Sequence, residues 1–451
     1  MRRVALGALV VLLALGLTRT TRAQTGRQPN DPLYARQSYL LAIHAPEAWT
    51  ITIGDPGVII AVVDSGIDLT HPDLAPNLRA NPNAGLAGCG DDAHGCDVLD
   101  PARAARSCGQ LPAAPSADVA PLTPRGTFLA GIVAAVGNNG QGIAGVMWQA
   151  TIIAVRAADC RGSTDEQTLA AGIAYAVRAG ARVILVGSMA KRTAANGCAP
   201  PRSALAQAVQ AARDAGVLVI AGAGDENASC VDDPAAAPGS LAVAGATLDG
   251  RRWVERKDGS NAGPQIAVAA PAAELLSTIP LQARRKPPDD RYAISSSTAY
   301  AAALVAGEAG LLLAANAALT PDWLTTLIVR SAHPLPDGDA PGWAGAGLID
   351  VAGALRLVPA ALRGTVTVDG TPAPDGTLIE AYVQGHSCGQ AATFFDGTRS
   401  TYALFVPTDA MQPGCGGPGR VIDVRVAGVA AATALWTPNA IALDLAASSG
   451  E

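Results

Sequence analysis

The sequence is poor in aromatic residues and in charge, and these shortages restrict the kind of protein it can be. Aromatic residues make up 4% of the 451 residues and hydrophobic residues 49%, so Ala, Val, Leu and Ile must fill most of the core. Charged residues make up 16% and leave a net charge of −6, which argues against a nucleic-acid partner. There is no CxxC pair, which argues against a zinc site made of thiolates, and no repeat of solenoid length. Gly, with 49 residues, and Pro, with 32, are plentiful and indicate many turns in a globular chain long enough for two or three domains.

Residues 1–23 have the pattern of a secretory signal. Arg2 and Arg3 precede an apolar run over residues 4–17, and the sequence TRA at 21–23 offers a small-residue cleavage site. An uncleaved anchor is the alternative, although the apolar run is short for a membrane span. We find no later stretch long and apolar enough to cross a bilayer, so we expect the mature chain outside the cell or at its surface.

Eight cysteines fit an oxidising compartment, where disulfides persist. Eight cysteines allow 105 pairings, so the sequence alone does not fix their connectivity. We expect Cys388 to pair with Cys415 inside one C-terminal module, and Cys198 to pair with Cys230 between two loops. A further disulfide should involve the cysteines of one insertion rich in Gly, Asp and Ala: Cys89, Cys96 and Cys108.

Short apolar runs alternate with Ala-rich stretches of helical length over the first three quarters of the chain. The runs VIIAVVD (58–64), TIIAVRA (151–157), RVILVGS (182–188) and GVLVIAGAG (216–224) are typical of strands buried on both faces of a parallel sheet. Helices are expected near residues 127–136, 166–180 and 203–216. The alternation predicts an α/β fold with an open parallel sheet, whose ligands lie at the carboxyl ends of strands. Asp64 ends the first clear strand.

From about residue 364 the pattern changes to alternation of apolar and polar residues. GTVTVDG, TLIEAYVQG, STYALFVP, RVIDVRVAG and NAIALDLA predict half-buried antiparallel strands. We place a boundary near residues 360–363 and expect a small β-sandwich over 360–451. It resembles carboxypeptidase-regulatory-like and collagen-adhesin-type modules, which would serve either as a spacer or in adhesion to a surface or glycan.

Five segments carry a stronger resemblance. VIIAVVDSGIDLTHPDL (58–74) resembles the aspartate segment of the subtilisin-like serine peptidases, and residues 30–49 resemble the N-terminal stretch of thermitase-like members. RGTFLAGIVAAVGNNGQGIAGV (125–146), GVLVIAGAGDEN (216–227) and SSSTAYAAALVAGEAGLLLAAN (295–316) resemble the histidine, oxyanion and serine segments. The resemblance covers about residues 30–358. It implies a subtilisin-like three-layer fold with a central parallel sheet, in a domain that we place at 24–359.

The resemblance also implies a catalytic triad, but two of its positions carry other residues. Asp64 matches the triad aspartate, which orients an imidazole. Arg125 stands in place of the histidine, and a guanidinium that stays protonated cannot act as a general base. Ala299 stands in place of the serine and Asp225 in place of the oxyanion-hole asparagine. Measurements on subtilisin itself show that losing the serine or the histidine lowers kcat about 2 × 10⁶-fold, so we expect a homologue without protease activity.

Other residues could take over the lost roles, which leaves an alternative open. The serines at 295–297 are near Ala299, but a shift of two positions at a helix start turns a side chain well away. An aspartate at the oxyanion position resembles the sedolisin-type peptidases, which still need a serine nucleophile. His71 belongs to the His-Pro-Asp turn. The remaining histidines match no catalytic position: His44, His94, His333 and His386.

The resemblance places a peptide-binding strand at Gly187, Ser188 and Met189, where the family has Ser-Leu-Gly. Backbone pairing with an extended peptide does not depend on side chains, so a substrate groove could persist. Arg125 could bind a ligand there, but we favour an ion pair with Asp64 that satisfies the carboxylate.

A calcium site is a further implication of the resemblance. Thermitase-like subtilases bind calcium tightly through residues that match Asp31, Asp73 and Asn139. These side chains are suitable oxygen ligands for Ca²⁺, although Asp31 could instead cap a turn and Asn139 could belong to a tight turn. Backbone carbonyls would complete the site: those near Val136, Gln141 and Ile143.

Three functions from different classes therefore compete. We favour a secreted, catalytically inactive subtilase homologue that binds a peptide or protein and is monomeric. The second is a serine-type endopeptidase that uses an unrecognised arrangement. The third is a structural surface protein that binds no peptide.

Overall fold

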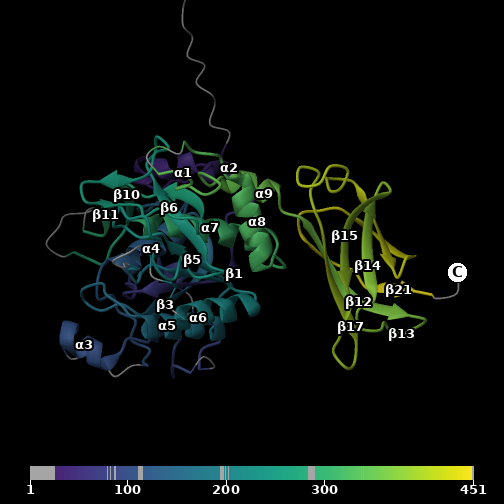
Figure 1. Cartoon of the computed structure of the whole chain (residues 1–451), viewed down its shortest axis with the longest axis horizontal. Coiled ribbons are helices and arrows are strands. Elements are labelled where there is room, and N and C mark those ends of the chain that lie inside the picture. The colour runs from purple at the N-terminus through teal and green to yellow at the C-terminus, as the bar shows by residue number, and fades with distance from the viewer. Residues whose placement is uncertain are drawn as a thin grey trace, which may run out of the picture.

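The computed structural model describes residues 26–448 apart from residues 79, 82, 86–87, 110–114, 193–197, 199, 202, 283–289, 337 and 339. The secretory signal expected at residues 1–23 lies outside the described residues and stays a prediction. Figure 1 shows an α/β part, coloured purple to green, beside a smaller part made of strands that continues the chain in yellow-green.

The α/β part is built on a sheet of seven described strands in the order β2-β3-β1-β4-β5-β6-β9. Every neighbouring pair in this sheet runs parallel. Most strand residues are buried, which explains why the strands read as continuous apolar runs. The strands are β1 (Gly54–Asp64), β2 (Gly95–Asp97), β3 (Gln149–Arg156), β4 (Val183–Val186), β5 (Leu218–Gly222), β6 (Leu241–Ala246) and β9 (Ile266–Pro271).

Helices cover both faces of this sheet, and the principal ones are α4 (Arg125–Ala134), α5 (Glu166–Arg178), α6 (Ser203–Asp214) and α7 (Thr298–Ala315). α4 and α7 share a buried cluster with Val62 of β1, whereas α5 shares the opposite cluster with the next residue, Val63. Alternate residues of one strand thus face two different layers. The three-layer subtilisin-like fold expected from the sequence is confirmed.

Shorter elements surround this core. They are η1 (Tyr34–Arg36), α1 (Ser38–Ala42), α2 (Ala45–Ala48), η2 (Ala75–Asn77), α3 (Pro101–Cys108), β7 (Val254–Glu255), β8 (Asp258–Gly259), β10 (Leu275–Thr278), β11 (Tyr292–Ser295), α8 (Pro321–Ser331) and α9 (Val351–Arg356).

α7 corrects one expectation from the sequence. Among the described residues it is a helix long and apolar enough to cross a membrane, although no later stretch was expected to qualify. In the structure 89% of it is buried inside the α/β part, so it is the core helix of this domain. Its glycines permit this close packing, because a Cβ at Gly307 would lie 2.5 Å from the side chain of Val146.

The C-terminal part contains two facing sheets and confirms the expected β-sandwich. Their orders are β13-β12-β17-β16 and β15-β14-β18-β19. β20 and β21 pair with β12 in parallel, whereas antiparallel pairing was expected to the end of the chain. This is a correction, since alternation gives the face of a strand but not the direction of its partner. The strands are β12 (Ala360–Val368), β13 (Thr371–Pro372), β14 (Leu378–Val383), β15 (His386–Ala392), β16 (Phe394–Phe395), β17 (Ser400–Val406), β18 (Val421–Val426), β19 (Val429–Leu435), β20 (Ala440–Ala442) and β21 (Leu445–Ala447).

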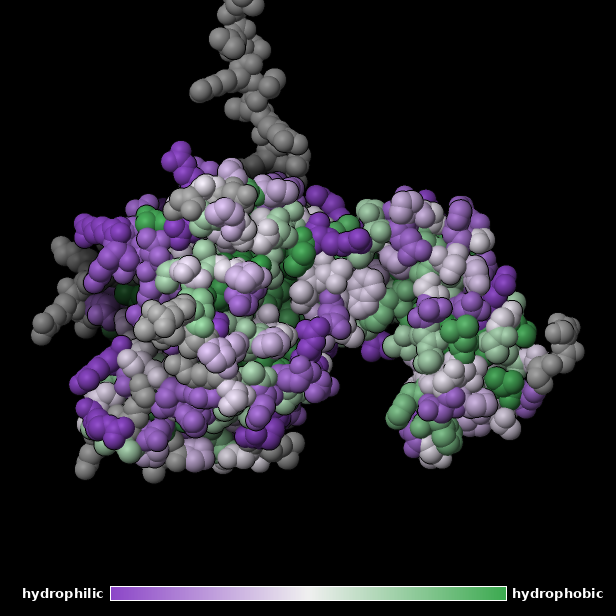
Figure 2. All heavy atoms as spheres, viewed as in Figure 1, coloured by the Kyte–Doolittle hydropathy of each residue, from purple (hydrophilic) through white to green (hydrophobic). Residues whose placement is uncertain are grey.

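The two parts meet beside α8. The rings of Trp323 and Phe405 lie 5.2 Å apart, and Met411 also packs against the α/β core. Asn316 donates from Nδ2 to the carbonyl of Pro359 at 3.0 Å, just before β12. Figure 2 shows a narrow waist where these segments join and hydrophilic side chains over much of the α/β surface.

The eight cysteines, all within the described part of the chain, form disulfides between Cys89 and Cys96, Cys108 and Cys160, Cys198 and Cys230, and Cys388 and Cys415. The last two pairs confirm the prediction, and the first confirms a disulfide within the insertion. The pair formed by Cys108 and Cys160 was not predicted. It ties α3 to the loop after β3.

Candidate functional site

Asp64, the last residue of β1, is the centre of a buried polar cluster and is 0% exposed. Arg125, the first residue of α4, donates from Nε to Asp64 Oδ2 at 2.9 Å. The hydroxyl of Ser188 donates to the same oxygen at 3.0 Å, and the N–H of Ser65 donates to Oδ1 at 2.7 Å. Arg125 also donates to Ser188 Oγ and, at 3.1 Å, to the carbonyl of Gly162. The carboxylate is therefore satisfied by groups of this chain, and the expected pair with Arg125 is present.

The arrangement holds Arg125 in its charged form. Burial alone would lower the pKa of Arg125, but the charge and hydrogen bond of Asp64, together with smaller contributions from Tyr300 and Asp225, outweigh burial, and the pKa is raised. A guanidinium offers no lone pair that could accept a proton. Arg125 is thus a permanent cation and cannot take a proton from a nucleophile.

Asp225 follows β5 and turns its carboxylate onto the start of α7. Oδ1 accepts the backbone N–H of Thr298 at 2.8 Å and its hydroxyl at 2.7 Å, and Oδ2 accepts the hydroxyl of Ser297 at 2.6 Å. Burial raises the pKa of Asp225, although hydrogen bonds from Ser297 and Thr298 oppose the shift. The dipole of α7 also favours an acidic group at this end. Both oxygens of Asp225 are therefore engaged by the helix start.

Ala299, the second residue of α7, is fully buried. Its methyl group can neither donate nor accept a proton, and its backbone N–H is bound by Ser297 Oγ at 3.1 Å. Tyr300, the next residue, lies within electrostatic reach of Arg125 and Asp64. β1, α4 and the start of α7 thus bring Asp64, Arg125 and Tyr300, the neighbour of Ala299, within electrostatic reach of one another.

A groove of about 630 Å³ opens beside this region, and a second hollow of about 590 Å³ shares Asp225 with it. Besides Asp225, the second hollow is lined by Trp253, Glu255, Arg256, Asp258, Glu274, Ile294, Ser295 and Ser296. The first is lined by residues 162–167 and 189–191 and by Arg125, Asp225, Glu226 and Asp232.

The residues predicted to form the peptide-binding strand divide between the groove and the interior. Met189 lines the groove, whereas Ser188 is fully buried and turns its hydroxyl to Asp64. Gly187 lies so close to Asp64 that a Cβ there would meet the carboxylate at 2.7 Å. These two residues therefore support Asp64 from behind the groove surface.

Carboxylates dominate the charge of the groove, and several were not singled out from the sequence. Glu226 pairs with Lys191 at 2.8 Å. Burial, together with the neighbouring Glu226, raises the pKa of Asp232 to about 7. Lys191 and Glu226 lie in the loops that follow β4 and β5, and the rule that ligands lie at the carboxyl ends of parallel strands could have found them.

The expected calcium ligands Asp31, Asp73 and Asn139 also lie together. Asp31 accepts the backbone N–H groups of Asn138 and Asn139 at 2.7 and 3.3 Å. Asp73 Oδ1 accepts Nδ2–H of Asn139 at 2.9 Å. Burial raises the pKa of Asp73 to about 6, with a further contribution from the charge of Asp31. Ionising both carboxyl groups side by side is costly. Together with the amide of Asn139 they form a set of oxygen donors that fits Ca²⁺.

The residues expected to supply carbonyls hold the same loop through their N–H groups. Val136 donates to the carbonyl of Asp73 at 2.9 Å, and Ile143 donates to Asp73 Oδ2 at 2.9 Å. Gln141 donates to Asn139 Oδ1 at 2.7 Å. Coordination by their carbonyls stays a prediction.

Comparisons with known proteins agree with this architecture. The model of the subtilase family, Peptidase_S8, matches residues 55–354. Thermitase of Thermoactinomyces vulgaris is 34% identical over 287 residues, which are 63% of this chain and 85% of thermitase. An extracellular protease of Xanthomonas campestris pv. campestris is 32% identical over 355 residues, which are 74% of this chain and 57% of that protein.

A solved structure gives the same result for the fold. A protease from Pseudoalteromonas arctica PAMC 21717 superposes with a TM-score of 0.60 at 26% identity, covering 73% of this chain and 99% of that one. Family model, relatives and fold agree, and the chain belongs to the subtilase family.

Proposed function

We propose that this chain is a secreted, catalytically inactive member of the subtilase family that binds an extended peptide segment of another protein. The observation that carries the proposal is the ion pair between Arg125 and Asp64, with Ala299 at the start of α7. The matching positions in the family carry the histidine, aspartate and serine of the catalytic triad. Here one position holds a permanent cation and another holds a methyl group, so neither a general base nor a nucleophile is available.

The oxyanion position supports the same proposal. Asp225 replaces a neutral donor with a carboxyl group whose oxygens are bound by Ser297 and Thr298. A tetrahedral intermediate needs donors aimed at its developing negative charge, and loss of one such donor costs about 10²–10³-fold in kcat. Loss of the nucleophile costs more, so activity falls near background.

Charge indicates which peptides the groove would bind. The acidic lining residues outnumber the basic ones, Arg125 and Lys191, and Asp64 already pairs with the first of these. Glu226 pairs with Lys191, which leaves further carboxylates on the walls. A peptide with a Lys or Arg side chain is therefore favoured over an acidic peptide.

An endopeptidase is the second candidate, and one contact favours it. The hydroxyl of Ser297 lies 2.6 Å from Asp225 Oδ2, and a carboxylate can activate a serine. Ser297 is 7% exposed, however, and its oxygen already binds the N–H of Ala299 as the cap of α7. Its hydroxyl is thus committed to the helix.

The deciding experiment is hydrolysis of casein and of mixed peptides by the purified mature protein, combined with a fluorophosphonate probe. We expect that the parent and the variants Asp64→Ala and Ser297→Ala will hydrolyse no substrate and that the probe will label none of them. Turnover abolished by Asp64→Ala would mean that a triad position has been assigned wrongly. Labelling lost in Ser297→Ala would identify Ser297 as the nucleophile.

Binding is tested separately with a peptide library. Enrichment of basic peptides that is reversed by Glu226→Gln supports the binding role. An unenriched library would favour a structural surface protein.

Calcium and export complete the proposal. We propose that Asp31, Asp73 and Asn139 bind Ca²⁺ and hold the loop after α4 against the N-terminal segment. Residues 1–23 would direct export of a chain that acts as a monomer outside the cell. One relative is named as an extracellular protease, which supports this location.

A further inference from the structure

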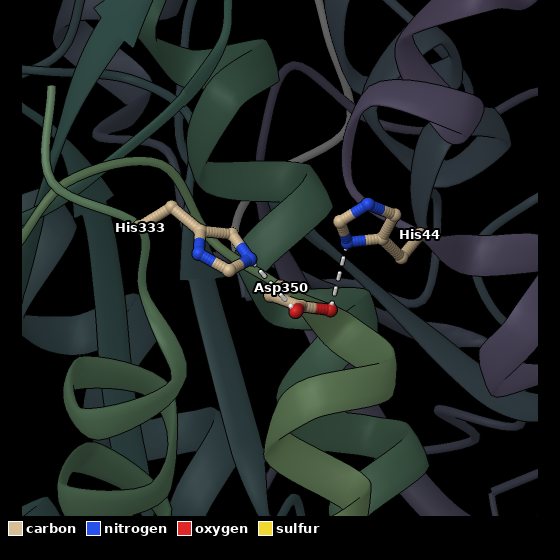
Figure 3. Close-up of side chains that lie close together, drawn as sticks. All are labelled: His44, His333 and Asp350. Carbon is tan, nitrogen blue, oxygen red and sulfur yellow. Dashed lines mark hydrogen bonds and ion pairs between the residues drawn. The ribbon is translucent and has the colours of Figure 1, made fainter.

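Three side chains from separate segments converge at a point that the groove does not use. His44 lies between α1 and α2, His333 follows α8, and Asp350 caps α9 (Figure 3). His44 Nδ1 lies 3.1 Å from Asp350 Oδ1, and His333 Nε2 lies 3.0 Å from Asp350 Oδ2. One ligand atom from each residue can be chosen so that all three lie within 4.8 Å of one another.

Backbone hydrogen bonds fix the positions of these side chains. The N–H of Val351 donates to the carbonyl of Ile43 at 3.0 Å, which joins the segments of Asp350 and His44. His333 and Leu348 exchange two hydrogen bonds of 2.8 Å, which join the segments of His333 and Asp350. Backbone hydrogen bonds therefore hold the three segments that carry the cluster against one another.

The carboxylate is oriented from its own helix. Asp350 Oδ1 accepts the N–H of Gly353 at 2.8 Å, the hydrogen bond of an N-cap. A Cβ on Gly353 would approach Asp350 Oδ2 to 2.7 Å, so the glycine leaves room for the carboxylate. Hydrogen bonds that orient a ligand from outside the site are a regular feature of metal centres.

The donor set is that of a transition metal rather than of calcium. Two imidazole nitrogens and a carboxylate suit Zn²⁺, whereas Ca²⁺ takes only oxygen ligands. Tetrahedral zinc with bonds of about 2.0–2.2 Å separates its ligand atoms by roughly 3.4 Å. Each imidazole lies 3.0–3.1 Å from a different oxygen of Asp350, and the three ligand atoms can be chosen within 4.8 Å of one another. The side chains of His44 and His333 are 44% and 59% exposed, so water can reach a fourth position.

We propose that His44, His333 and Asp350 bind one Zn²⁺ ion, with water as the fourth ligand. The ion would join the N-terminal segment to the last helix of the α/β part, a few residues before β12 begins. We assign the ion a structural role, because it would hold together the first and last segments of this part. The connection to the β-sandwich follows α9.

The test uses full-length mature protein whose purification tag has been removed, because a polyhistidine tag binds the same metals. Zn²⁺ is titrated by equilibrium dialysis and by thermal unfolding, with Ca²⁺ present throughout so that the predicted calcium site does not contribute. Co²⁺ serves as a spectroscopic probe, since tetrahedral nitrogen and oxygen ligands give strong visible absorption. We expect one Zn²⁺ per chain and a rise in Tm of at least about 2 °C.

The variants separate a metal site from a simple ion-pair cluster. His44→Asn keeps a residue that tolerates the positive φ of 55° at this position, and His333→Gln keeps a hydrogen-bond donor toward Asp350. Each should weaken Zn²⁺ binding at least about 100-fold and remove the Co²⁺ band, because these residues are direct ligands. His386→Ala, an exposed histidine in the β-sandwich, is the matched control and should change neither result.

Absence of Zn²⁺ binding to the parent would overturn the proposal and leave an ion-pair cluster. Binding that survives the His44→Asn/His333→Gln double variant would overturn it as well, since the metal would then lie elsewhere.

Discussion

The buried carboxyl groups at the groove and those in the predicted calcium loop have different kinds of partners. Asp64, behind the groove surface, has Arg125 and Ser188 as partners, and Asp225 on the groove wall has the start of α7. In the loop, burial raises the pKa of both Asp31 and Asp73, and the charge of Asp31 adds to the shift of Asp73. A carboxylate paired with a cation of its own chain, as Asp64 is, has no need of a further cation, whereas carboxylates gathered without one are suited to an added cation. The difference fits the proposed function, in which the chain has lost its chemistry and still binds a cation.

The most disruptive change should be removal of the cation from the groove. Arg125→Met leaves the fully buried Asp64 without its charged partner, and we expect the free energy of unfolding to fall by about 3–5 kcal/mol. Urea denaturation measures the loss. The double variant Asp64→Asn/Arg125→Met should recover most of it, because the unpaired charge is then gone. A loss below about 1 kcal/mol in the single variant would show that water or a neighbouring group satisfies Asp64.

Adding calcium should stabilise the loop that holds Asp31, Asp73 and Asn139. At a Ca²⁺ concentration about 100 times Kd, we expect a gain of about 2.7 kcal/mol, seen as a rise in Tm that EDTA reverses. Asp73→Asn should abolish the gain, and Asp214→Asn, an exposed aspartate at the end of α6, should leave it intact. An unchanged Tm across the titration would remove calcium from the proposed function.

A further buried carboxyl group, Glu308 of α7, extends the comparison because it belongs to neither region. Neither of its carboxyl oxygens has a hydrogen-bond partner among the described residues, and burial raises the pKa of Glu308 well above its usual value. Glu308→Leu should therefore stabilise the protein by about 1–3 kcal/mol at neutral pH, measured by urea denaturation.

The pH dependence of this effect has a definite sign. The folded state keeps a proton on Glu308 that the unfolded state releases above its ordinary pKa of 4.5, so the parent loses stability as pH rises through and beyond that value. The advantage of Glu308→Leu should widen over the same range. Glu308→Gln is the matched control, which removes the titration and keeps a polar group. An advantage that is constant between pH 4 and pH 8 would contradict the protonated state.

The smallest effect should come from Asp225→Asn. The asparagine restores the family's residue type but gives up charge at the start of α7, and we expect a loss of about 1 kcal/mol without any gain in peptide hydrolysis. Asp258 lines the second hollow together with Asp225, so Asp258→Asn controls for a general change in the charge of that hollow. Measurable turnover in Asp225→Asn would show that the oxyanion position alone had silenced the enzyme.

The sequence predicted the parallel sheet well because strands buried on both faces read as uninterrupted apolar runs. The resemblance to the subtilisin-like peptidases also predicted the contact between Arg125 and Asp64, because the aspartate and histidine of that family touch. It could not predict that Ser188 points inward or that Asp225 turns to α7, because side-chain direction depends on packing. His44, His333 and Asp350 were missed as a group for a related reason. They are far apart in the chain, and only the folded segments bring them together.

The occupied start of α7 has a practical consequence. Fluorophosphonates and other serine-reactive reagents detect a protease through its nucleophile and the donors beside it, and on the proposed function this chain offers neither. A survey of extracellular proteases made with such reagents would pass over this protein even where it is abundant. Its presence would have to be followed by antibody or by mass spectrometry.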